Sequence, residues 1–68
     1  MPIIQVNMME GRSEAQKRDL IAKMTDAVVA ALGAPRESVR IMINEMKPEH
    51  FAVGGVSFAE RKKQNNQS

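Results

Sequence analysis

A single helical pattern separates two strand-like segments in this chain, and that order leaves few folds open. Residues 3–9 alternate in side-chain character, with Ile4, Val6 and Met8 pointing one way, which predicts a strand. Residues 39–46 alternate in the same manner and predict a second strand. A strand, a long helix and another strand form a β-α-β unit, in which the strands run parallel with a right-handed crossover. We therefore expect an α/β (α+β) protein built on one short β-α-β unit.

The helix between these strands has signals at both ends. Ser13 and Gln16 fit a capping box at its start. Gly33 suits the residue that follows a helix, and Pro35 prevents continuation, so the helix should end near Leu32. One face carries apolar residues at helical spacing: Leu20, Ile21, Met24, Ala27, Val28, Ala31 and Leu32. Charged residues are expected on or near the other face: Lys17, Arg18, Lys23 and Asp26.

The remainder of the chain predicts smaller elements. The apolar segment 51–56 contains a Gly-Gly pair, which favours a C-terminal hairpin or bent ribbon. Residues from about Phe58 are expected to form one helical turn. A single domain is expected over residues 1–63, because residues 64–68 have the polar composition of a disordered tail.

This architecture leaves apolar surface uncovered. One helix covers only one face of a two-stranded sheet, yet both faces of each strand carry apolar side chains. Ile3 and Ile4 point to opposite faces of the first strand, and Ile41 and Met42 point to opposite faces of the second. A chain of 68 residues without cysteine also has no disulfide to reinforce a small core. Exposed apolar faces and open sheet edges need a partner, and another copy of the chain is the simplest one. We expect a homo-oligomer.

Composition excludes several classes of protein. His50, the only histidine, is expected to be a solvated loop residue, and the scattered carboxylates give no metal-ligand spacing, so no metal site is predicted. No apolar run approaches the ~20 residues of a membrane span and no signal peptide is recognisable, which favours the cytoplasm. The net charge of +2 is too small to demand nucleic acid and suits a small anionic ligand if arginines converge on one site. The run Arg61-Lys62-Lys63 is expected to be a solvated charge run. A small basic module for nucleic acid is a weaker alternative, because only two aromatic residues exist for stacking.

Pro2 is a candidate catalytic residue. The initiator Met1 is normally removed when a small residue such as proline follows, which would leave Pro2 with a free secondary amine. An α-amine titrates near pH ~8 in a model peptide, and apolar burial or a nearby cation lowers such a pKa. A neutral Pro2 nitrogen would then be a general base. The alternative is that Pro2 simply begins an edge strand.

Three further residues are candidates for binding. In a parallel pair the start of the second strand lies beside the start of the first, so Arg40 should lie near Pro2, where it would lower the pKa of the amine and bind an anion. A salt bridge to Glu45 or to a neighbouring chain is the alternative for Arg40. Arg12 precedes the helix and, taken alone, suits a solvated turn residue. Phe51, taken alone, suits a core or interface aromatic residue.

Taken in order, these residues resemble a known family. The matching positions are Pro2, Glu10-Gly11-Arg12-Ser13, Gln16-Lys17, Ala34-Pro35, Ser38-Val39-Arg40, Glu45-Met46, His50-Phe51 and Gly54-Gly55. They resemble 4-oxalocrotonate tautomerase (2-hydroxymuconate tautomerase), a member of the tautomerase superfamily, over most of the chain. The resemblance implies a β-α-β protomer in a homohexamer built as a trimer of dimers. It also implies a cofactor-free isomerase of aromatic hydrocarbon catabolism.

The resemblance also implies roles for individual residues. Pro2 would be the general base that moves a proton between the 2-hydroxyl side of the substrate and C-5. Arg40 would bind the carboxylate and 2-oxygen end and stabilise the dienolate, and Arg12 would bind the distal carboxylate. Phe51 would form the apolar wall that keeps Pro2 neutral, and Met9 would help to shape the pocket. In the family these groups come from more than one subunit.

Departures from the family pattern bear on the reaction. Met9 and Val53 replace other aliphatic residues, which should reshape the pocket only mildly. Val53 occupies the position at which the family's hydratase-type dehalogenases carry a water-activating carboxylate, which argues against dehalogenation as the main activity. Decarboxylation or dehalogenation of a small three-carbon acid, with the same fold and Pro2, is the alternative to tautomerisation.

Overall fold

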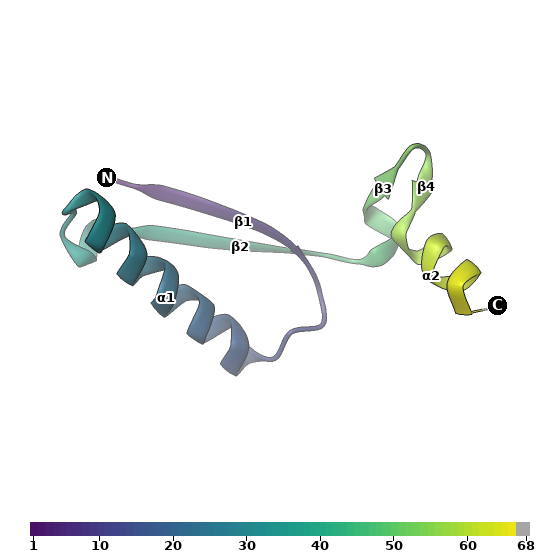
Figure 1. Cartoon of the computed structure of the whole chain (residues 1–68), viewed down its shortest axis with the longest axis horizontal. Coiled ribbons are helices and arrows are strands. Elements are labelled where there is room, and N and C mark those ends of the chain that lie inside the picture. The colour runs from purple at the N-terminus through teal and green to yellow at the C-terminus, as the bar shows by residue number, and fades with distance from the viewer. Residues whose placement is uncertain (67–68) are drawn as a thin grey trace.

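The computed structural model describes residues 1–66, with the side chains of residues 1–63, and it has the expected order of elements (Figure 1). The elements are β1 (Ile3–Met9), α1 (Glu14–Leu32), the 3₁₀ turn η1 (Arg36–Ser38), β2 (Arg40–Met46), the 3₁₀ turn η2 (Pro48–His50), β3 (Ala52–Val53), β4 (Val56–Ser57) and α2 (Phe58–Asn66). The first strand has its predicted bounds, and the second begins one residue later than predicted. The β-α-β unit with a C-terminal hairpin is confirmed.

The two long strands form a parallel pair, as predicted. Ile3 lies opposite Arg40, and the register continues to Met9 opposite Met46. The backbone N–H of Arg40 donates to the carbonyl of Pro2 at 3.0 Å, which extends the ladder by one residue toward the amino terminus. The starts of both strands therefore lie side by side, and so do their ends.

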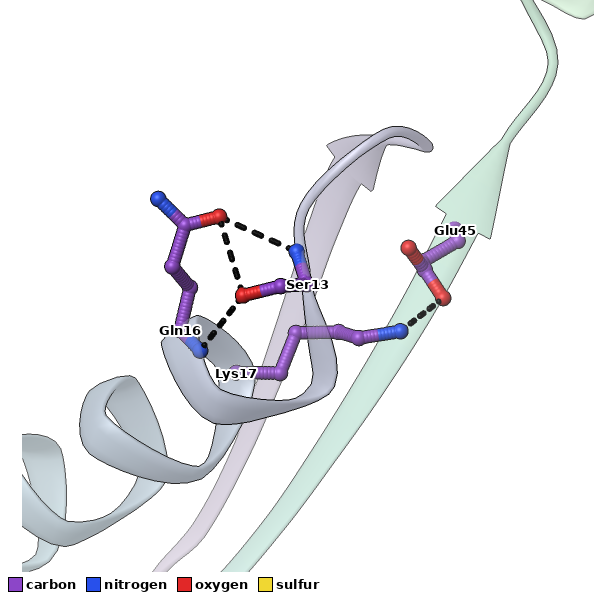
Figure 2. Close-up of polar contacts among 4 residues, drawn as sticks. All are labelled: Ser13, Gln16, Lys17 and Glu45. Carbon is purple, nitrogen blue, oxygen red and sulfur yellow. Dashed lines mark hydrogen bonds and ion pairs between the residues drawn. The ribbon is translucent and has the colours of Figure 1, made fainter.

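Both ends of α1 follow the sequence signals. Ser13 Oγ accepts from the backbone N–H of Gln16 at 3.1 Å, and Gln16 Oε1 accepts from the N–H of Ser13 at 3.0 Å (Figure 2). Gly33 has φ 67° and its N–H donates to the carbonyl of Val29 at 2.9 Å. That left-handed conformation suits glycine, which lacks a Cβ atom. The capping box and the glycine stop are confirmed.

Helix α1 covers one face of the sheet (Figure 1). The apolar strand residues that alternate toward it are half-buried: Ile4, Val6 and Met8 from β1, with Ile41 and Ile43 from β2. On the other face Ile3 is 58% exposed and Met42 is 50% exposed. No described side chain belongs to a fully buried core. One protomer alone therefore leaves apolar surface in water, as the sequence predicted.

Some positions on α1 differ from the predicted faces. Lys17 was expected among the outward charges, but it is half-buried and pairs with Glu45 of β2 at 2.8 Å. Ile21 and Leu32 were expected to pack, but they are 41% and 68% exposed. A sheet of two strands is narrower than the apolar stripe of the helix, so residues at the edge of that stripe find nothing to cover. Asp19 and Lys23, four residues apart on α1, form an ion pair at 2.9 Å.

Residues 48–66, which include η2, β3, β4 and α2, form an arm that stands apart from the β-α-β body (Figure 1). Strands β3 and β4 pair antiparallel around a Gly-Gly turn, and the N–H of Phe58 donates to the carbonyl of Phe51 at 2.7 Å. Helix α2 is longer than the expected single turn and includes residues 64–66 of the predicted tail. Residues 67–68 lie outside the described residues, and the 1–63 domain boundary stays a prediction. No helix in the described part of the chain is long and apolar enough to span a membrane.

Candidate functional site

The strand starts hold Pro2 and Arg40. Pro2 is half-buried, and its carbonyl accepts the backbone hydrogen bond from Arg40. The exposed guanidinium of Arg40 donates through Nη1 to the carbonyl of Ser38 at 3.0 Å. The alternative ion pair with Glu45 is wrong within the protomer, because Glu45 lies at the other end of β2 and pairs with Lys17. The remaining N–H groups of Arg40 have no partner within residues 1–63 and are available to an anion.

The strand ends hold Arg12 and Met9. Arg12 is exposed in the connection between β1 and α1, and its guanidinium makes no hydrogen bond or ion pair with the described side chains. It lines two shallow hollows of about 330 and 350 Å³, the second of which also includes the half-buried Met9. An unpaired guanidinium is a strong, bidentate receptor for a carboxylate. This end of the sheet can therefore bind an anionic group.

The C-terminal arm presents an apolar surface around Phe51. Phe51 is 40% exposed, and its ring packs edge-on against Phe58, with ring centroids 6.2 Å apart. Both rings line a hollow of about 230 Å³ together with Val53, and Arg61 closes one side of it by donating to the carbonyl of Val53 at 2.9 Å. This surface can exclude water from a group that a second chain places against it.

One protomer does not bring these three parts together. Strand β1 has seven residues and is about 23 Å long, so Pro2 and Arg12 lie at opposite ends of the sheet. Phe51 lies between η2 and β3, beyond the far end of β2 and on the arm. Arg40 is the only predicted site residue beside Pro2 in the described chain. The expectation that the site combines several subunits is consistent with this spacing and stays a prediction.

Sequence reasoning missed the contact between Lys17 and Glu45, which are 28 residues apart. The topology offered a signal, because a β-α-β unit places the end of β2 beside the first turns of α1, and each of these segments carries one charge. On the same helix, Lys23 donates a hydrogen bond to the Asp19 carboxylate, and this bond together with the negative charge of the carboxylate raises the pKa of Lys23. Within the described residues, no three His, Cys, Asp or Glu side chains gather as a metal site would require.

The sequence of this chain is similar to those of proteins in a known family. The family model described as tautomerase enzyme matches residues 2–61. The chain belongs to the tautomerase family. A probable tautomerase of Staphylococcus aureus is 46% identical over 61 residues, which are 90% of this chain and all of that relative. Members of the family are isomerases by name, so the match assigns the chain to that broad class of enzyme.

Solved structures of the tautomerase family have the same fold. A 4-oxalocrotonate tautomerase isozyme of Methylibium petroleiphilum superposes with a TM-score of 0.89 at 48% identity, covering 93% of this chain and 98% of that one. A heterohexamer 4-oxalocrotonate tautomerase of Chloroflexus aurantiacus gives a TM-score of 0.82 at 42% identity, covering 88% and 97%. The small β-α-β fold with parallel strands and an antiparallel hairpin is therefore the tautomerase fold.

Proposed function

We propose that this chain is a cofactor-free tautomerase that interconverts the enol and keto forms of 2-hydroxymuconate-like unsaturated dicarboxylates. Membership of the family supports the reaction class. The similarity to 4-oxalocrotonate tautomerases supports the substrate class. Arg12 and Arg40 also support it, because their guanidinium groups are open to carboxylates. A dicarboxylate carries one negative group for each of them.

The catalytic base in this proposal is the amine of Pro2, freed by removal of Met1. Its nitrogen takes the proton from the 2-hydroxyl side of the substrate and returns a proton at C-5. Arg40 binds the carboxylate and 2-oxygen end, where negative charge develops in the dienolate, and stabilisation of such charge is often the largest catalytic contribution. The observation that carries this assignment is the 3.0 Å hydrogen bond from the Arg40 N–H to the Pro2 carbonyl, which holds the two residues side by side.

The other site residues come from neighbouring subunits in this proposal. Arg12 of a second protomer receives the distal carboxylate, Met9 shapes the pocket beside it, and Phe51 of a further protomer covers the Pro2 amine. The proposed assembly is a homohexamer, a trimer of dimers. Support comes from the distance between Pro2 and Arg12 along β1, from the exposed ring of Phe51, and from the hexameric relative of Chloroflexus aurantiacus.

The test combines intact mass with kinetics. The purified protein should have lost Met1 and should convert 2-hydroxymuconate to its keto form, followed by ultraviolet absorbance. Pro2→Ala should reduce kcat by about 10²- to 10⁴-fold, the usual contribution of a positioned general base. Full activity in protein that retains Met1, or in Pro2→Ala, would contradict the proposal. A larger kcat/KM for decarboxylation or dehalogenation of a three-carbon acid would move the assignment to that alternative reaction.

A further inference from the structure

The segment that carries Arg12 is held at both of its ends. Before it, the backbone N–H of Glu10 donates to the carbonyl of Met46 at the end of β2, at 2.9 Å. After it, Ser13 is fixed by the capping box, and its carbonyl accepts from the N–H of Lys17 at 3.1 Å. Arg12 itself has no side-chain partner among the described residues. Its position is therefore set by how the first turn of α1 lies against the end of β2.

One side-chain contact fixes that relation. Lys17 Nζ reaches from the first turns of α1 to Glu45 Oε1 of β2 at 2.8 Å, beside the capping box (Figure 2). Of the four ion pairs among the described residues, it is the one that joins α1 to β2. Its two side chains are 28% and 31% exposed, whereas the side chains of the other three pairs are all more than half exposed. Lower exposure reduces solvent screening, so this pair can constrain geometry where exposed pairs contribute little.

We propose that Lys17 and Glu45 are positioning residues that hold Arg12 in place for the distal carboxylate, and so set the preference for dicarboxylates. This inference rests on the proposed function. Without the pair, the first turn of α1 and the adjoining Arg12 can shift relative to the sheet. A misplacement of about 1 Å can cost a factor of about 10² in rate when a binding group no longer meets its substrate. The loss should fall on substrates that have a second carboxylate.

Direct binding is the competing explanation for Lys17, because its side chain lines the same 330 Å³ hollow as Arg12. The two explanations differ in what they predict for Glu45. If Lys17 acts only through its ion pair, Glu45→Gln should impair dicarboxylate binding as Lys17→Met does. If Lys17 binds the carboxylate itself, Glu45→Gln should free its ammonium group and leave binding equal or tighter.

The experiment compares two substrates on Lys17→Met, Glu45→Gln and the double variant, each checked for its assembled mass. The substrates are 2-hydroxymuconate and 2-hydroxypenta-2,4-dienoate, which lacks the distal carboxylate. We expect each single variant to raise KM for the dicarboxylate about fivefold or more and to leave kcat/KM for the monocarboxylate within about twofold. The double variant should be no worse than either single one, because both remove the same interaction.

Two further variants separate positioning from general stability. Lys17→Arg keeps the ion pair and should retain most of the wild-type preference. Arg18→Met removes the exposed ion pair with Glu14, which lies within α1 at 2.8 Å, and should leave KM and kcat/KM for both substrates unchanged. Equal losses for both substrates in Glu45→Gln, or an unchanged or lower dicarboxylate KM in that variant, would overturn the proposal. A wild-type protein inactive on both dienols would overturn the proposed function, and the positioning role with it.

Discussion

We expect another copy of the chain to bury the sheet face that α1 leaves uncovered. Substitutions of Met42, which lies on that face, test this expectation. Met42 lies on that face, next to Arg40 and Asn44 on the same strand, and is 50% exposed in the protomer. Full burial of a methionine side chain is worth about 1.5–3 kcal/mol. Covering the exposed half therefore stabilises an assembly by about 1 kcal/mol per subunit, or about 6 kcal/mol in a hexamer.

Substitutions at Met42 should weaken the assembly in a graded series. Met42→Leu keeps the volume and should leave assembly nearly unchanged. Met42→Ala removes most of the apolar area and should shift dissociation to roughly fivefold higher protein concentration per subunit contact. Met42→Lys would bury an unpaired ammonium group beside Arg40, at a cost of several kcal/mol, and should give smaller species.

Sedimentation velocity and native mass spectrometry would measure the assembly across a dilution series, with 2-hydroxymuconate turnover recorded on the same samples. Activity should fall together with the largest species, because Pro2 and Arg12 of one protomer lie at opposite ends of the seven-residue β1, which is about 23 Å long. The control is Ala22→Asp, which places a charge on the exposed side of α1 between Arg18 and Asp26. A Met42→Lys protein that stays assembled and fully active would refute the reasoning about this face.

The remaining predictions concern the catalytic groups and the helix cap. Arg40→Lys should lower kcat about 10²-fold, because an ammonium cannot reproduce the planar fork of a guanidinium, and steady-state kinetics would measure it. In the proposed mechanism Phe51 covers the Pro2 amine and the base is neutral, so Phe51→Ala should raise the pKa of that amine and move the acidic limb of the kcat/KM profile to higher pH. Ser13→Ala should cost about 1 kcal/mol of stability through loss of the cap, measured by urea unfolding at fixed protein concentration.

The features predicted best are those set by neighbouring residues. The start of α1 depends on Ser13 and Gln16, three residues apart, and its end on the glycine that adopts φ 67°. Alternation of apolar residues gave the two long strands to within one residue. Their parallel pairing followed from connectivity alone, because a helix between two strands of one sheet carries the chain back to the same edge.

The errors have a different origin, since they depend on what a side chain meets after folding. Lys17 has the spacing of an outward helical charge, but the end of β2 lies within its reach and Lys17 forms an ion pair with Glu45 there. Ile21 has the spacing of a core residue, but the two-stranded sheet ends before it. Both outcomes depend on the width of the sheet and on the position of the helix above it. The spacing of apolar and charged residues in the sequence gives neither the width of the sheet nor the position of the helix.

The site also depends on distances that one protomer cannot span. A general base with a lowered pKa must be withdrawn from water, but a chain of 68 residues in which no described side chain is fully buried has no interior to offer. The chain instead presents separate partial surfaces: an amine and a guanidinium at the strand starts, a second guanidinium at the strand ends, and aromatic rings on the arm. If copies of the chain bring these surfaces together, the contacts that stabilise the assembly also desolvate Pro2. Stability and catalysis would then depend on the same interfaces, which explains why a protein this small can leave so much apolar surface uncovered in each protomer.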